Sequence, residues 1–141
     1  MMDRSITALL FASLAVRVAA EPPPASQPTR QAAITRTDLQ RHDLSVTGLE
    51  AIQTIVSFPP GASAAKHMHP GEEIIYVLAG SIAYQVGHDA PAVLRAGDVL
   101  FVPKETPHSA RNVGNVAAAE LATYIVEKGK PLVVLVDQSE K

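Results

Sequence analysis

The chain has 141 residues, of which 47% are hydrophobic and 18% charged, a composition typical of one globular domain with a core of ordinary size. Its net charge is −2, aromatic residues make up only 4%, and there is no Trp. We therefore expect no nucleic-acid partner, because neither a basic surface nor a base-stacking surface is present. The absence of Cys excludes disulfides, thiolate metal ligands and cysteine nucleophiles.

Residues 1–20 have the layout of a secretory signal peptide. Arg4 precedes an apolar run over 6–16, and small side chains stand just before Glu21. The run is about eleven residues long, whereas a membrane-spanning helix needs roughly 20. We therefore expect a periplasmic or secreted protein with no stable membrane anchor. The alternative is that this segment is an apolar N-terminal strand or helix of the domain.

A proline-rich segment follows over 21–35 and is predicted to be an extended tether. Residues 36–141 are predicted to form a single domain. Near its start, Thr37 to Gln40 matches a capping box and predicts one short helical turn.

From Glu50 onward, the sequence has the features of an all-β protein. Apolar residues alternate with polar ones, and short stretches rich in Val, Ile and Tyr end at Gly or Pro. Nine short strands are expected, over 50–58, 64–69, 72–79, 82–86, 92–94, 99–102, 108–113, 117–126 and 132–136. Since no helical stretch is long enough for a βαβ crossover, we predict an antiparallel jelly-roll β-barrel or sandwich.

The first candidate functional stretch contains His67, His69 and Glu73. On a strand, residues two apart share a face, so the two imidazoles should project the same way, and Glu73 has the same parity. Two neutral imidazoles and one carboxylate are good ligands for a divalent metal ion. The alternative for an isolated His-X-His pair is a solvated loop.

The second stretch runs from Gly97 to Asn112 and contains His108. Gly97 and Pro103 bracket a short apolar strand, and Pro107 fixes the approach to His108. This third imidazole is expected to meet the first pair only if the two hairpins face each other across a barrel.

These residues resemble the two motifs of the cupins. The first motif, G(X)5HXH(X)3–4E(X)6G, is matched at every fixed position, by Gly61, His67, His69, Glu73 and Gly80. The second, G(X)5PXG(X)2H(X)3N, is matched by Gly97, Pro103, His108 and Asn112. It departs at one place, where Glu105 stands in the position of the family's glycine.

The resemblance implies a jelly-roll fold and a metal site with four ligands, His67, His69, Glu73 and His108. Nitrogen and oxygen ligands without sulfur suit a divalent transition metal such as Fe, Mn, Ni, Cu or Zn. Cupins with this ligand set are often dioxygenases, decarboxylases or isomerases, and others bind ligands without turnover. Three functions therefore stay open: an oxidoreductase of the dioxygenase type, a periplasmic protein that binds a metal or small ligand, and a non-redox isomerase or lyase. Glu73 is the one candidate for a general base.

The surroundings of the site and the partners give further expectations. Ile75 and Val77 share the parity of Glu73 and should face the barrel interior. Arg111 should face away from His108, which would leave the pocket with little fixed positive charge and favour a small, weakly polar ligand. A homodimer is possible, with 132–136 as either an interface strand or an internal strand.

Overall fold

The computed structural model describes residues 33–136, which form ten strands and no helix. The strands are β1 (Thr35–Asp43), β2 (Leu49–Phe58), β3 (Ser63–Met68), β4 (Gly71–Ala79), β5 (Ser81–Val86), β6 (Ala92–Arg95), β7 (Val99–Val102), β8 (His108–Asn112), β9 (Ala118–Glu127) and β10 (Val134–Leu135). The predicted all-β jelly roll is confirmed.

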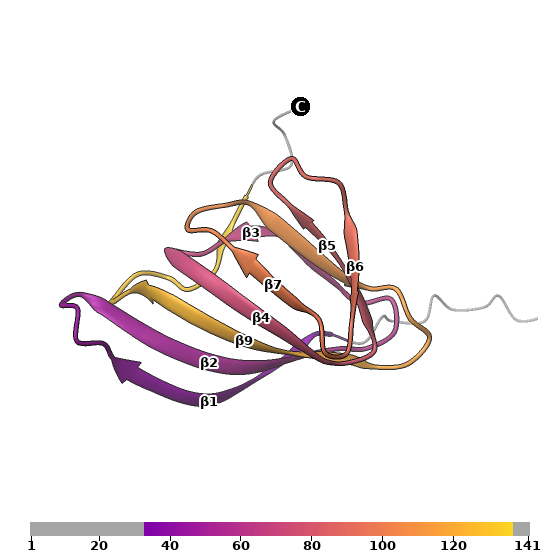
Figure 1. Cartoon of the computed structure of the whole chain (residues 1–141), viewed down its shortest axis with the longest axis horizontal. Coiled ribbons are helices and arrows are strands. Elements are labelled where there is room, and N and C mark those ends of the chain that lie inside the picture. The colour runs from indigo at the N-terminus through magenta and orange to yellow at the C-terminus, as the bar shows by residue number, and fades with distance from the viewer. Residues whose placement is uncertain (1–32, 137–141) are drawn as a thin grey trace, which may run out of the picture.

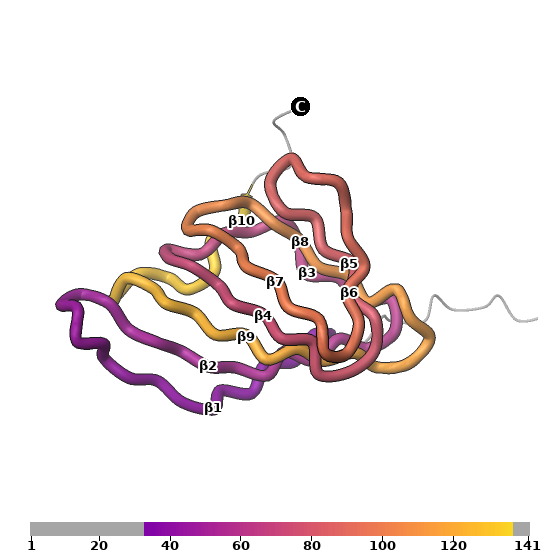
Figure 2. Tube along the Cα trace, in the orientation of Figure 1, coloured from indigo at the N-terminus to yellow at the C-terminus, as the bar shows by residue number. Residues whose placement is uncertain are grey.

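The strands form two antiparallel sheets of five strands each. One sheet has the order β1-β2-β9-β4-β7 and the other the order β10-β3-β8-β5-β6. Figure 1 shows the first sheet rising from β1 through β2, β9 and β4 to β7, and the trace in Figure 2 shows β3, β8 and β5 of the second sheet above it. Apart from β1–β2 and β5–β6, strands that follow one another in sequence lie in different sheets, as in other jelly rolls.

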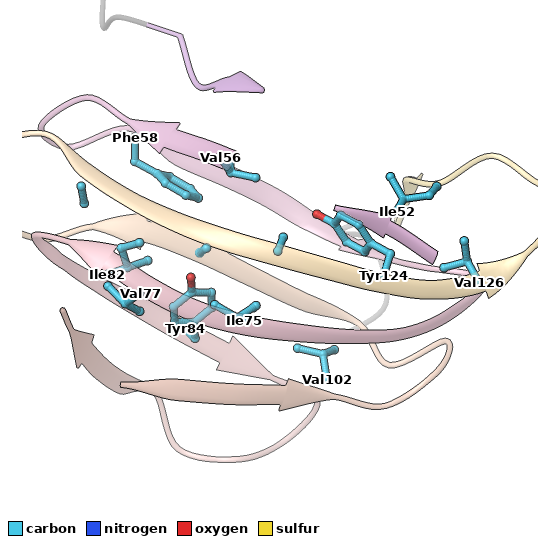
Figure 3. Close-up of a cluster of buried hydrophobic side chains, with 13 residues drawn as sticks. Ile52, Val56, Phe58, Ile75, Val77, Ile82, Tyr84, Val102, Tyr124 and Val126 are labelled. Atoms are coloured by element: carbon cyan, nitrogen blue, oxygen red, sulfur yellow. The ribbon is translucent and has the colours of Figure 1, made fainter. Parts of the chain in front are cut away.

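The core lies between the two sheets because the long strands β2, β4 and β9 each bury one of their faces. In β2 and β9, buried and half-buried residues alternate along the whole strand, as period-two patterning requires. Figure 3 shows Tyr84 of β5 and Tyr124 of β9 among these core side chains. The prediction that Ile75 and Val77 face inward is confirmed, since both are buried.

The first strand corrects one expectation. The residues from Thr37 to Gln40 do not form a helical turn but belong to β1, which pairs with β2 along its length. The register shifts between Asp38 and Gln40, so that Leu39 has no Cα partner in the ladder. The capping-box pattern is a local preference, and hydrogen bonding to β2 satisfies the same backbone groups in the sheet.

Predictions were made for both ends of the chain: a signal peptide and a tether at the N-terminal end, and a strand over 132–136 at the C-terminal end. The predicted signal peptide at 1–20 lies outside the described residues, as does nearly all of the tether predicted at 21–35, and export of the protein stays a prediction. Within residues 33–136, there is no helix long and apolar enough to cross a membrane. At the other end, only Val134 and Leu135 form a strand, and they pair with β3 inside the same chain. The run over 132–136 thus contributes an internal strand, and homodimer formation stays a prediction.

Candidate metal centre

Four buried side chains converge at one end of the core. His67 lies on β3, His69 directly after that strand, Glu73 on β4, and His108 at the start of β8. Each histidine offers one ring nitrogen, and these three atoms lie within 4.8 Å of one another. Glu73 Oε2 lies 3.3 Å from His69 Nε2 and 3.1 Å from His108 Nε2. The structure therefore brings together all four residues that the sequence singled out.

The route by which His108 reaches the cluster differs from the expected one. His108 does not approach across the barrel, because β8 is the neighbour of β3 and His108 is the direct register partner of His67. Glu73 is the residue that comes from the other sheet, through β4. The sequence could not show this, because strand order in a sheet depends on pairings between distant segments.

Backbone carbonyls orient all three imidazole rings. The Nδ1 atoms of His67, His69 and His108 lie 2.7, 2.6 and 2.9 Å from the carbonyl oxygens of Ala65, Leu132 and Thr106. A carbonyl only accepts, so Nδ1 must be the donor, and in a neutral ring Nε2 then carries the lone pair. Metal-binding histidines are commonly held in this way.

Two atoms of the cluster have no hydrogen-bond partner among the described residues. These buried atoms are His69 Nε2 and Glu73 Oε2. A buried polar atom without a partner is rare and costly, and here a lone pair and a carboxylate oxygen face each other at 3.3 Å. Their repulsion needs a positive charge between them. Three imidazole nitrogens and one carboxylate oxygen therefore fit a divalent transition metal ion.

The ionisation of two of these groups suits such an ion. Burial lowers the pKa of His67 to about 4, so its ring is neutral near pH 7. Burial raises the pKa of Glu73, but the imidazoles of His108 and His69, which lie within 3.3 Å of its carboxylate, lower the pKa to about 2. Metal ligands must be unprotonated in this way before they can coordinate.

A small cavity adjoins the cluster, and four of its polar side chains were not predicted from the sequence. Besides His67, Glu73 and His108, its lining includes Arg36, Tyr84, Glu120 and Tyr124. The cavity volume is about 10 Å³, which is room for roughly one water molecule. The alternation of β9 was the signal that could have placed Glu120 inside, because Glu120 and the inward-facing Tyr124 have the same parity.

A larger recess of about 400 Å³ adjoins the cavity and shares lining residues with it. Arg36 of β1 lines both spaces, together with His67 and Ala64. Arg111 is exposed, as expected, but the expectation of a pocket with little fixed positive charge is wrong, because Arg36 supplies such a charge at the boundary. Arg36 was missed because strand β1 was not predicted: only a helical turn over 37–40, which begins after Arg36, was expected there.

The remaining polar residues of the motifs have other roles or none at this site. Asn112 is buried and structural: its Nδ2 donates to the carbonyl oxygens of Phe58 and Val116, both at 2.8 Å, and its Oδ1 accepts from the backbone N–H of Gly114. His42 and His88, which lie outside both motifs, are exposed and do not belong to the cluster.

Known proteins share both the sequence and the fold of this chain. An oxalate-binding protein of Thermotoga maritima is 40% identical over 73 residues, which are 50% of this chain and 59% of that protein. Dimethylsulfoniopropionate lyase DddQ of Ruegeria pomeroyi is 37% identical over 57 residues, 40% of this chain and 28% of that one. The matched segments therefore span less than two thirds of either relative.

Among solved structures, a protein with a double-stranded β-helix domain from Klebsiella pneumoniae superposes with a TM-score of 0.62 at 19% identity. The superposition covers 79% of this chain and 90% of that one, so the two share a fold. The family described as "Cupin domain" matches residues 54–126, just over half of the 141 residues. The chain belongs to the cupin family.

Proposed function

We propose that the protein is a metal-dependent oxidoreductase that acts on a small organic substrate at a site formed by His67, His69, Glu73 and His108. The observation that carries the proposal is the convergence of three carbonyl-anchored imidazoles on a carboxylate oxygen that has no other partner. A divalent ion held there would supply Lewis acidity and, if it is Fe, Mn or Cu, a centre for electron transfer.

The side chains that line the cavity limit the size of the substrate and include a candidate base. Apolar residues such as Phe58 and Ile75 form part of the lining of the cavity, which has room for roughly one water molecule. A larger substrate would lie partly in the adjoining recess. Glu73 is the candidate base, since its carboxylate is ionised and points into the cluster.

Two alternatives are each favoured by one relative. The similarity to an oxalate-binding protein favours a protein that holds a small ligand without turnover. The similarity to a lyase favours a non-redox reaction that uses an ion such as Zn²⁺. Fold alone does not decide among these functions.

The first experiment is metal analysis of the untagged protein, followed by oxygen-consumption assays of the iron- and manganese-loaded forms with a panel of small enols and diketones. We expect one metal ion per chain, and oxygen uptake with at least one member of the panel. His108→Ala should lose the ion, because three ligands remain of four. His88→Ala removes an exposed histidine and is the matched control, which should keep the ion.

The outcomes separate the alternatives. One-to-one metal binding by His108→Ala would overturn the four-ligand site. A metal-loaded protein that consumes no oxygen with any compound would remove the oxidoreductase proposal and leave the binding protein or the lyase. Protein purified with Zn²⁺ alone and inactive with iron would favour the lyase.

A further inference from the structure

The outer face of the first sheet is apolar over β4 and β7, two strands that run side by side (Figure 1). Five large apolar side chains on these strands point outward and are between 42% and 67% exposed: Ile74, Tyr76, Leu78, Val99 and Phe101. They lie close together, because Ile74 is the register partner of Phe101 and Tyr76 that of Val99. We call these five residues the β4–β7 patch.

The core of this chain does not account for the patch. A strand with one face in solvent needs an apolar residue only at every second position. β4 and β7 instead carry continuous apolar runs, over 74–78 and 99–102, in which Ile75, Val77 and Val102 already fill the core. Continuous apolar runs are typical of strands that are covered on both faces.

Polar side chains border the patch toward β1. Gln40 Nε2 donates to Gln53 Oε1 at 2.8 Å, and Gln53 Nε2 donates to Thr123 Oγ1 at 3.1 Å. These residues of β1, β2 and β9 form one row across the sheet, which continues into Ile74 and Phe101. An apolar centre with a polar border is the usual arrangement of a protein–protein interface.

The face carries little charge that could keep two copies of the chain apart. The outward residues of β2, β4, β7 and β9 include two charged side chains, Glu72 and Glu127, both at the end of the sheet away from Leu78. Glu127 forms ion pairs with Lys104 and Lys130. A two-fold axis places the same surface of both copies in contact, so an uncharged patch brings no like charges together.

The face is also large enough for a stable dimer. β2, β9 and β4 have nine or ten residues each, and β7 has four. With about 3.3 Å per residue and about 4.8 Å between strands, the face measures about 500 Å² per chain, or about 1,000 Å² in a pair. A specific interface needs about 1,000 Å² of accessible surface in total, and projecting side chains make the accessible area larger than that of the flat face.

We propose that the outer face of the first sheet, centred on the β4–β7 patch, binds a second copy of this chain in a two-fold homodimer. The metal site stays accessible in such a dimer. The recess beside that site is lined by residues of β1, β3 and the C-terminal segment, and β1 and β7 are opposite edges of the first sheet. Both recesses would therefore open away from the interface.

Nitration of tyrosine tests the proposal on the wild-type protein. The chain has three tyrosines, of which Tyr84 and Tyr124 are buried and Tyr76 is 45% exposed. Sedimentation velocity over a range of concentrations would measure the dimer dissociation constant, and tetranitromethane followed by peptide mass spectrometry would measure the modification of Tyr76. We expect a dimer at micromolar concentration in which Tyr76 is protected, and a monomer at higher dilution in which Tyr76 reacts.

Phe101→Lys and Tyr76→Lys each place a charge in the patch, and the two-fold axis would place both copies of that charge in one interface. Each variant should raise the dimer dissociation constant about a hundredfold or more, as expected for an unpaired buried charge. In Phe101→Lys, Tyr76 should react at concentrations that protect it in wild type. Val93→Lys is the matched control, because Val93 is also 45% exposed but lies on β6 of the other sheet, and it should dimerise as wild type does.

The other outcomes overturn the proposal. If the wild-type protein stays monomeric, no second copy binds, and protection of Tyr76 in that monomer would mean that another segment of the chain covers the patch. A dimer in which Tyr76 reacts, or which both lysine variants leave intact, is joined through another surface. Should a lysine variant fail to fold, the concentration dependence of Tyr76 nitration in wild type decides. None of these readouts needs the metal, so a failure of the proposed function would leave this inference standing.

Discussion

Glu105 stands where the second cupin motif has glycine, yet its backbone keeps the conformation that favours glycine. Its φ is 55°, and it is the one non-glycine residue with positive φ among residues 33–136. Its N–H donates to the carbonyl oxygen of His69 at 3.0 Å, so this strained turn supports the backbone of a proposed metal ligand. Glutamate at this motif position therefore raises the conformational free energy of the turn, while the backbone keeps its left-handed conformation.

Glu105→Gly should stabilise the protein. Left-handed backbone costs a side-chain-bearing residue about 1–2 kcal/mol, and part of this gain is offset by the greater freedom of glycine in the unfolded chain. We expect a net gain of about 0.5–1 kcal/mol in the free energy of unfolding, measured by urea denaturation, with metal content unchanged. Glu105→Ala removes the charge and keeps the strain, so it should match wild type. Equal stability of the Gly and Ala variants would show that the turn is not strained.

The sequence predicted the site residues that belong to a local motif. It missed the site residues that reach the cavity only through the pairing of strands distant in sequence. His67, His69, Glu73 and His108 were found because their spacing is a motif. Glu120 carries no motif, and only its position on an alternating strand indicates that it points inward. Arg36 reaches the site only because β1 adds to the edge of the first sheet, a pairing that the local pattern does not contain.

Strand β4 packs unusually close to β9 at its first residue. A Cβ atom on Gly71 would lie 2.0 Å from the carbonyl oxygen of Ile125 and 2.6 Å from the Cα atom of Val126. Both obstacles are backbone, so no side-chain rotation can relieve the overlap. Gly71 is also two residues from Glu73, and any displacement of β4 moves that carboxylate.

Gly71→Ala should therefore destabilise the metal-free protein by about 3 kcal/mol or more, the upper range for overpacking, and weaken metal binding as well. Gly97→Ala is the matched control, because Gly97 has a φ of 94° but open space around its Cβ position. It should cost only the strain of about 1–2 kcal/mol and leave the metal affinity unchanged. Urea denaturation and metal titration would measure both effects, and equal losses in the two variants would contradict the close-packing argument.

The elements that the sequence predicted well are those with a buried face. The ranges of β2 and β9 were predicted closely because their apolar residues recur at every second position, as the alternating burial of these strands requires. β1 was missed because all nine of its residues are exposed, so no apolar alternation marks it as a strand. The prediction that two hairpins face each other across the barrel was wrong for a different reason. The pairing of β3 with β8 depends on the topology of the whole sheet, and neither segment alone indicates it.

At the scale of the whole molecule, three buried groups set the pH dependence of folding in the metal-free protein. His67 has a pKa of about 4 when folded and an ordinary value of 6.5, so the unfolded chain takes up a proton first and stability is lost as pH falls from 6.5 to 4. Glu73, with its pKa lowered to about 2 from 4.5, adds a loss between pH 4.5 and pH 2. Both effects oppose folding in acid.

Glu120 acts in the opposite direction. Its pKa of about 8 lies above its ordinary value of 4.5, so the unfolded chain releases a proton that the folded chain retains, and stability falls as pH rises from 4.5 to 8. Between pH 4.5 and pH 6.5 the effects of His67 and Glu120 largely cancel, which places the stability maximum in that window. From pH 6.5 to pH 8 only the Glu120 effect remains, and it amounts to about 2 kcal/mol.

Urea denaturation in the presence of a chelator, at several pH values from 4 to 9, would measure this profile. Wild type should lose stability from pH 6.5 to pH 8, and Glu120→Gln should not, because glutamine cannot ionise. The variant should instead gain stability up to about pH 6.5, where the His67 effect is complete, and stay level above it. Glu127→Gln should keep the wild-type decline. A decline that persists in Glu120→Gln would mean that another group ionises in this range, and that Glu120 is already charged in the folded cavity.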